Sequence, residues 1–149
     1  MPLVTLSPAR VLRDVLVGEG VVAAPAEGAV WPAYVASEPD GAGVPDNVVT
    51  VYDTAANSDG RTQNDGVHNE HYGCQIRIRS ADHPTGWSKA ASIRDALDQI
   101  YKDSVTVDGV TYTIHSVSRR GGVLSLGRAD TGTRRRLFTI NVILTGKES

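Results

Sequence analysis

Apolar residues recur at helical spacing soon after the start of the chain. Ser7-Pro8 is typical of a helix start, because a serine side chain can cap free N–H groups and proline fits the first turn. Gly18 supplies a stop. The pattern predicts a short amphipathic helix over residues 8–17, which must dock on a larger element to be stable. Its apolar positions are Val11, Leu12, Val15 and Leu16.

A strict alternation of apolar and polar residues follows in the middle of the chain. Between Tyr72 and Arg79 every second residue is suited to burial, which predicts a strand with one face in the core. Cys74, Ile76 and Ile78 fall on that buried face. The cysteine is therefore expected to be a small core residue.

A second and longer helical pattern comes directly after this strand. It predicts a helix over about 86–102, with charged side chains on the opposite side from an apolar stripe. The stripe follows 3-4-3 spacing and consists of Ala90, Ile93, Leu97 and Ile100.

The rest of the chain is rich in strand patterns separated by turn residues. Asp108-Gly109 matches the tight turn of a β-hairpin between strands expected over 105–107 and 110–114. A last strand is expected over 135–144, with an apolar face made of Phe138, Ile140, Val142 and Leu144. Other extended segments are expected over 29–36, 47–54 and 123–126.

The order of helix, strands, helix and strands predicts an α+β fold. We expect one mainly antiparallel twisted sheet, with an N-terminal helix and one long central helix packed on it. The chain has 149 residues, enough for a self-contained core, so a single domain over 1–149 is expected.

Residues 55–70 form a long polar stretch between two predicted strands. A connection of this length without secondary structure is uncommon in a compact domain and is usually functional, or disordered when isolated. We expect an arm that projects from the domain and becomes ordered against a partner. The alternative is a loop that is simply surrounded by solvent. Arg61 and Asp65 are the candidate contact residues of this arm.

The net charge of −2 conceals two unlike halves. Residues 1–70 hold 3 basic and 10 acidic residues, whereas residues 71–149 hold 12 basic and 7 acidic residues. Such asymmetry suggests opposite faces that meet copies of the same chain or a charged partner. The alternative is that the charges mix in space and the asymmetry has no role.

Arginines are concentrated in the basic half. A run at 134–136 stands near three further arginines in the sequence, and such groups can neutralise phosphates. No aromatic residues are interleaved with the run, as a base-stacking surface would require. Contact with the acidic half of a neighbouring subunit fits the charges better. The alternatives are a nucleic-acid-binding module and arginines that are simply salt-bridged or solvated. The candidate interface arginines are Arg119, Arg120, Arg134, Arg135 and Arg136, with Arg128 nearby.

Few patterns in the sequence suggest catalysis. His68, His71 and Cys74 have spacing that could suggest zinc, but the strand alternation turns the cysteine inward and no fourth ligand has typical spacing. Nucleophile-elbow, phosphate-loop and dinucleotide-binding motifs do not occur in the sequence. We therefore expect no enzymatic activity, no metal and no cofactor.

The sequence also bears on the compartment. A single cysteine excludes an internal disulfide framework. The first residues lack the charged start and apolar core of a signal peptide, and no apolar run is long enough to cross a bilayer. We expect a protein that is made and kept in a reducing cytosol, with no membrane partner.

The features resemble, in their order and spacing, the tail terminator (tail-to-head joining) proteins of long-tailed, siphophage-type bacteriophages, also called minor capsid or tail completion proteins. The resemblance spans nearly the whole chain, although each motif alone is ordinary strand-and-turn chemistry. The polar arm is richer in polar residues than expected of the family. The motifs are Ser7-Pro8, the segments 47–54, 72–79 and 107–112, Gly127-x2-Asp130-x-Gly132-x-Arg134, and the segment 138–142.

The resemblance implies a structural virion protein that is assembled in the host cytoplasm. It implies a homo-oligomeric ring, commonly of six copies, at the head-proximal end of a tail tube. The partners it implies are the tail tube protein and a head-completion (stopper) protein, while DNA passes through the lumen without being read. Another head-tail connector component, either a stopper or a tail tube protein, is the alternative within the same assembly.

Overall fold

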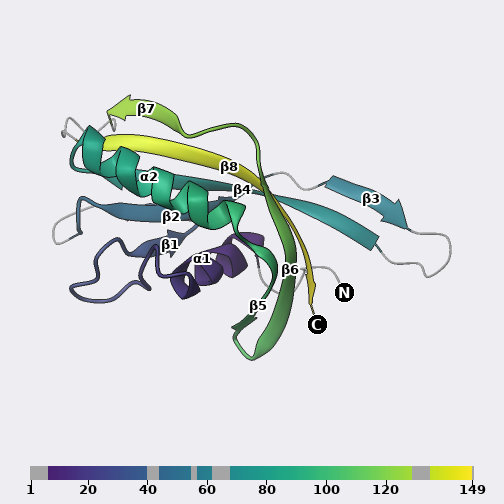
Figure 1. Cartoon of the computed structure of the whole chain (residues 1–149). Coiled ribbons are helices and arrows are strands. Elements are labelled where there is room, and N and C mark those ends of the chain that lie inside the picture. The colour runs from purple at the N-terminus through teal and green to yellow at the C-terminus, as the bar shows by residue number, and fades with distance from the viewer. Residues whose placement is uncertain (1–6, 40–43, 55–56, 62–67, 129–134, 149) are drawn as a thin grey trace.

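The computed structural model describes residues 7–39, 44–54, 57–61, 68–128 and 135–148. Figure 1 shows the arrangement of its helices and strands. In chain order these are α1 (Pro8–Gly18), β1 (Ala33–Val35), β2 (Val48–Asp53), β3 (Asn57–Arg61), β4 (His68–Ser80), α2 (His83–Asp98), β5 (Tyr101–Val107), β6 (Val110–Arg119), β7 (Leu124–Arg128) and β8 (Arg136–Glu148).

Across the described ranges the strands form one sheet of eight. Six of them have the order β1-β2-β4-β8-β6-β5, while β3 pairs with β4 and β7 pairs with β8. The short strand β1 runs parallel to β2, and all the other pairs are antiparallel. The expected α+β class, with a mainly antiparallel sheet and two helices in these places, is confirmed.

Two long central strands organise the sheet, and each is flanked by two shorter strands in succession. β2 and then β3 follow one edge of β4, with Asp53 opposite Cys74 and Asn57 opposite His71. β6 and then β7 follow one edge of β8 in the same way. The ladder between β4 and β8 is continuous from the pair His71–Thr145 to the pair Ser80–Arg136.

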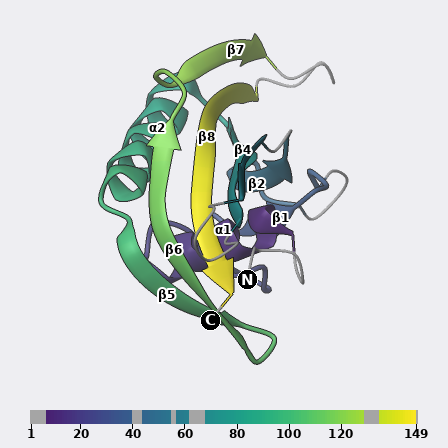
Figure 2. The ribbon, with the colours of Figure 1, turned by 90° about the vertical axis from the view of Figure 1, so that its right-hand side faces the viewer.

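The core lies between the curled sheet and the two helices. Both helices pack on the same face of the sheet, and α1 also contacts α2 (Figures 1 and 2). Alternation along β4 and β8 supplies this face, because residues directly opposite each other share a side of the sheet. Each of the residues expected in the core from the sequence is at most 3% exposed: Val11, Leu12, Cys74, Ile76, Ile78, Ile93, Leu97, Ile100, Phe138, Ile140 and Val142.

Helix α1 begins where the sequence predicts because two side chains satisfy its first amides. The Arg10 amide donates to Ser7 Oγ at 3.3 Å, and the Ala9 amide donates to Asp53 Oδ1 at 2.9 Å. Asp53 stands at the end of β2, so this hydrogen bond also fastens the helix to the sheet. A carboxylate at a helix N-terminus is favoured by the helix dipole as well.

Helix α2 differs at both ends from the expected range of about 86–102. It starts at His83, because Asp82 caps it by accepting a hydrogen bond from the Thr85 amide at 2.8 Å. It ends at Asp98, and the Gln99 and Ile100 amides bond in a tighter turn to Ala96 and Leu97. Ile100 is still buried, so the apolar stripe continued past the end of the helix and could not reveal that end.

The expected hairpin turn is present between β5 and β6. Asp108 and Gly109 have φ values of 51° and 80°, as the primed turn that suits twisted strands requires. β5 nevertheless starts at Tyr101, four residues earlier than expected, because the chain enters the strand directly after α2.

The sequence predicts no secondary structure over residues 55–70, and this is wrong for the residues of the stretch that the structure describes. β3 pairs antiparallel with the first residues of β4, which starts at His68 and not at Tyr72. The polar stretch therefore contains a strand pair where the sequence suggested an irregular connection. Neither segment of this pair, 57–61 or 68–71, contains an apolar residue, so the alternation that marked the strand from Tyr72 is absent from both.

Candidate functional site

The first candidate surface is the arm at residues 55–70, of which the structure describes β3 (57–61) and the paired start of β4 (68–70). It extends from the sheet beyond both helices (Figure 1). At its base, His71 Nδ1 lies 2.9 Å from Thr145 Oγ1 on β8, which ties the arm to the central ladder. Arg61 ends β3 opposite His68. Asp65, the other candidate residue, lies outside the described residues.

The second candidate surface is the basic end, defined by Arg135 and Arg136 where β8 begins. Arg136 pairs with Ser80 at the end of β4 that is farthest from the arm. β4 has 13 residues, so about 40 Å of strand separates the two ends. Arg135 donates from Nε to Asp46 Oδ1 at 2.8 Å. Arg134 lies outside the described residues.

Arg119 and Arg120 occupy the region where β6 gives way to β7. Arg119 forms a two-point ion pair with Asp98 at the end of α2, with distances of 2.7 Å and 3.1 Å. This hydrogen bonding to Asp98 raises the pKa of Arg119 above its usual value. The backbone amide of Arg120 donates to the Asn141 carbonyl at 2.7 Å. Arg119 thus has a partner within its own chain, and its contact with a neighbouring subunit stays a prediction.

Arg120 and Arg136 differ from Arg119 and Arg135 in their ion pairing. Neither Arg120 nor Arg136 makes an ion pair within the part of the chain that the structure describes; Arg120 is exposed and Arg136 is half-buried. Among the candidate interface arginines, these two therefore have no carboxylate partner in the described part of the chain. Their role at an interface stays a prediction as well.

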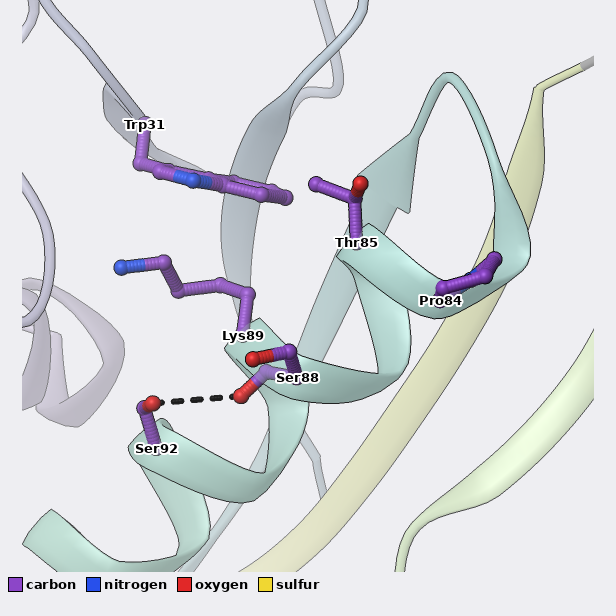
Figure 3. A pocket seen from close by; sticks show the side chains of 6 residues that line it. All are labelled: Trp31, Pro84, Thr85, Ser88, Lys89 and Ser92. Atoms are coloured by element: carbon purple, nitrogen blue, oxygen red, sulfur yellow. Dashed lines mark hydrogen bonds between the residues drawn. The ribbon is translucent and has the colours of Figure 1, made fainter.

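A groove of about 450 Å³ lies between α2 and the chain segment that leads into β1 (Figure 3). The indole of Trp31 forms one wall, and the first half of α2 forms the other. The helix side carries two serines and a threonine, whose hydroxyls can donate or accept hydrogen bonds. The lining residues are Trp31, Pro84, Thr85, Ser88, Lys89 and Ser92.

Lys89 is the only ionisable residue that lines this groove in the described structure. Its Nζ lies 5.4 Å from the centroid of the Trp31 ring and donates to the Val21 carbonyl at 2.8 Å. Partial burial lowers the pKa of Lys89, because desolvation disfavours the ammonium form. The groove therefore holds a cation that has lost part of its water without gaining a carboxylate partner among the lining residues.

The backbone holds Trp31 in an uncommon conformation. Its φ is 56°, in the left-handed region that non-glycine residues rarely adopt. Neighbouring hydrogen bonds impose this conformation: the Ala23 amide donates to the Trp31 carbonyl at 3.0 Å, and the Val49 amide donates to the Pro32 carbonyl at 3.0 Å. Such conformations persist only where the surroundings determine them strongly, and they are concentrated at functional sites.

Several apolar side chains are exposed near the basic end. Trp87 on α2 is 43% exposed and packs edge-on against Phe138 of β8. Leu124 and Leu126 on β7 are 53% and 50% exposed. An exposed apolar strand at the edge of a sheet is a surface that readily pairs with another chain.

The structure separates His71 and Cys74, two of the three residues whose spacing could suggest zinc. Cys74 is buried toward the helices. His71 lies three residues earlier, on the opposite face of β4, and contacts Thr145. Burial, assisted by the nearby charge of Asp53, raises the pKa of Cys74 to about 12. Its thiolate, the form that binds metals, is therefore suppressed. The described residues contain no cluster of three or more potential metal ligands, and no described helix is long and apolar enough to span a membrane.

Sequence reasoning missed two features of these surfaces. Arg79 was expected on the polar face of its strand, yet it is 3% exposed and donates to the carbonyls of Pro39 and Pro45 at 2.7 Å and 3.0 Å. It thereby holds the connection before β2 against the sheet. The groove at Lys89 was missed because its two walls are far apart in sequence, and no local pattern marks Trp31 and Lys89 as neighbours.

Comparison with known proteins defines the class of this chain. Residues 18–145, from the end of α1 into β8, match the family of bacteriophage tail terminator proteins, which are structural components of phage virions. The chain belongs to this family. No curated protein matches the chain.

Proposed function

We propose that this protein forms a homo-oligomeric ring at the head-proximal end of a phage tail tube. There it stops polymerisation of the tube and joins the tail to a head-completion protein. The family match over residues 18–145 carries this proposal. The virion is then the site of action, after assembly in the host cytoplasm.

The separation of the arm from the basic end supports a ring. In the sequence the polar stretch 55–70 contains three acidic residues and one arginine, whereas Arg135 and Arg136 stand at the far end of the β4–β8 ladder. Two unlike and complementary surfaces on one chain give a head-to-tail contact, which closes into a ring when the rotation is suitable. Six copies is the number that the family resemblance implies.

The charges also weigh against sequence-specific reading of nucleic acid. Arg119 and Arg135, two of the arginines that would contact phosphates, are already paired with Asp98 and Asp46. Charged contacts of this kind set register and partner choice more than affinity. In the proposed ring DNA passes through the lumen without specific binding, and the two faces of the ring meet the tail tube protein and the head-completion protein.

Removal of this protein from the phage tests the proposed function. Without a terminator, tube growth has no stop, so electron microscopy of lysates is expected to show tails longer than those of the wild-type phage and heads without attached tails. Native mass spectrometry of the purified protein and of isolated tails measures the number of copies. Tails of normal length in its absence, or a strict monomer that never joins tails, would falsify the proposal.

A further inference from the structure

The chemistry of the groove at Lys89 suits an anionic group. Its single cation is partly desolvated, and the carbonyl of Val21 accepts one of the three hydrogen bonds that an ammonium can donate. Hydroxyl groups of Thr85 and Ser88 line the same side of the groove (Figure 3). A carboxylate placed there would meet a charge that lacks a counter-ion among the lining residues, together with neutral hydrogen-bond donors.

The position of the groove gives a second argument. Its helix wall starts three residues after β4 ends, so it lies at the end of the sheet that is opposite the arm (Figure 1). The arm of the same chain points away from it. A second copy in a head-to-tail arrangement brings its own arm toward this end.

The polar stretch supplies the matching charge. It contains Asp59, Asp65 and Glu70 against one arginine, Arg61. The carboxylate of Asp82, two residues before the lining residue Pro84 in the sequence, is engaged as the cap of α2, and its hydrogen bond with the Thr85 amide lowers the pKa of Asp82. Asp82 therefore keeps its negative charge at the helix N-terminus and does not compensate Lys89 by an ion pair in the structure.

We propose that the groove between Trp31 and α2 receives a carboxylate from the arm of a second copy of this chain, which forms an ion pair with Lys89. This inference rests on the proposed ring and names the contact that closes it. The indole of Trp31 covers the lysine stem and limits access of water, so the ion pair forms in a less polar setting than an exposed one.

Zero-length cross-linking tests the contact directly. A carbodiimide joins a lysine to a carboxylate only when the two are in contact, and a mixture of ¹⁵N-labelled and unlabelled subunits distinguishes bonds between chains from bonds within one. On the assembled oligomer or isolated tails, mass spectrometry is expected to find Lys89 joined to Asp59, Asp65 or Glu70 of another chain. Assembled protein in which Lys89 joins no acidic residue of another arm overturns the inference and leaves the ring intact.

Matched lysine variants give an independent measurement. Lys89→Met keeps the apolar stem beneath Trp31 but removes the charge, and we expect half-assembly to require about a tenfold higher concentration, the equivalent of one lost ion pair. Lys102→Met is the control, because Lys102 also lies over an aromatic ring, that of Tyr101, but at the other end of α2. Its assembly is expected to be unchanged.

Charge exchange separates a specific contact from loss of structure. Lys89→Glu is expected to block assembly, and a second change of one arm acid to lysine, among Asp59, Asp65 and Glu70, is expected to restore it. Thermal unfolding of each variant is recorded alongside. Equal weakening by Lys89→Met and Lys102→Met, or no rescue by any of the three exchanges in folded protein, overturns the inference. A wild-type chain that stays monomeric in solution and is absent from tails overturns both this inference and the proposed ring.

Discussion

At the scale of single residues, burial decides the chemistry of Cys74. The side chain is 1% exposed, and its pKa is raised from 9.0 to about 12, first by desolvation and then by the charge of Asp53. In the unfolded chain the same thiol ionises near its ordinary pKa. The folded protein therefore keeps a proton that the unfolded chain loses between these two pKa values.

This difference predicts a loss of stability at alkaline pH. The contribution of Cys74 is fully present below pH 9, and it declines as the pH rises toward 12, because the unfolded state then binds fewer protons. The free energy of unfolding should approach a decrease of about 1.4 kcal/mol per pH unit from this group alone. Urea unfolding of wild type and Cys74→Ala between pH 8 and 10.5 measures it. Parallel pH dependences for the two proteins would contradict the prediction.

The sequence pattern predicted which face of the sheet a side chain occupies better than it predicted which residues that side chain contacts. The alternation in β4 and β8 was enough to put Ile76, Ile140 and Phe138 in the core, since a side chain's face depends on strand geometry alone. It failed for Arg79, whose burial comes from carbonyls 34 and 40 residues earlier in the chain. Contacts of that kind depend on tertiary folding, and one sequence carries no local sign of them.

At the scale of elements, the packing of α2 on β8 depends on the absence of a side chain at Gly86. A Cβ at this position would overlap the ring of Phe138 and would lie 2.9 Å from Ser80 Cβ. The close approach brings the first turns of the helix against the sheet, and it places Trp87 edge-on to Phe138. The glycine is thus required by packing, although alanine is the better helix former.

Gly86→Ala is accordingly expected to destabilise the fold. The helix gains about 1 kcal/mol in intrinsic propensity, but the added methyl group must displace a buried ring. We expect a net loss of about 1–3 kcal/mol in the free energy of unfolding, as for other overpacked cores. Gly18→Ala at the end of α1 is the matched control, because nothing lies within 4 Å of the added Cβ there. Urea unfolding of the two variants checks this, and equal stability of both would refute it.

Element boundaries were predictable only where a local signal ends an element. Ser7-Pro8 and Asp108-Gly109 are such signals, and the structure has the helix start and the turn at these residues. The end of α2 was placed four residues late because Ile100 continues the apolar spacing from inside a turn. β3 was missed because its sequence, Asn-Ser-Asp-Gly-Arg, contains no apolar residue and therefore shows no alternation.

At the scale of the whole molecule, the arrangement of charge is the property that assembly can use. Arg135 and Arg136 mark one end of the central ladder and the arm marks the other. The polar stretch 55–70, with three acidic residues and one arginine, and the arginine run at 134–136 each contribute part of the unequal charge of the two halves of the sequence. The sequence indicated the unequal charge of its two halves. The register of β4 and β8 adds that the polar stretch and the arginine run lie at opposite ends of the central ladder.

Charge reversal at the arginine run is expected to prevent assembly without unfolding the protein. The variant carries Arg134→Glu, Arg135→Glu and Arg136→Glu, and its oligomer should be lost in native mass spectrometry while its circular dichroism is kept. A second variant that retains Arg135 preserves the ion pair with Asp46. It should behave in the same way, because the other two charges carry the proposed contact. An unchanged oligomer and unchanged dichroism in both variants would show that the run is not an interface.

The continuous ladder between β4 and β8 has a mechanical consequence. Both flanking edges are interrupted, between β2 and β3 and between β6 and β7, but the ten paired positions from His71–Thr145 to Ser80–Arg136 are not. Tension between a neighbour held at the arm and another held at the basic end would load these hydrogen bonds along the strands, in shear and all at once. Each subunit would then act as a stiff link, and a stretched ring would yield at the contacts between subunits before the subunits themselves.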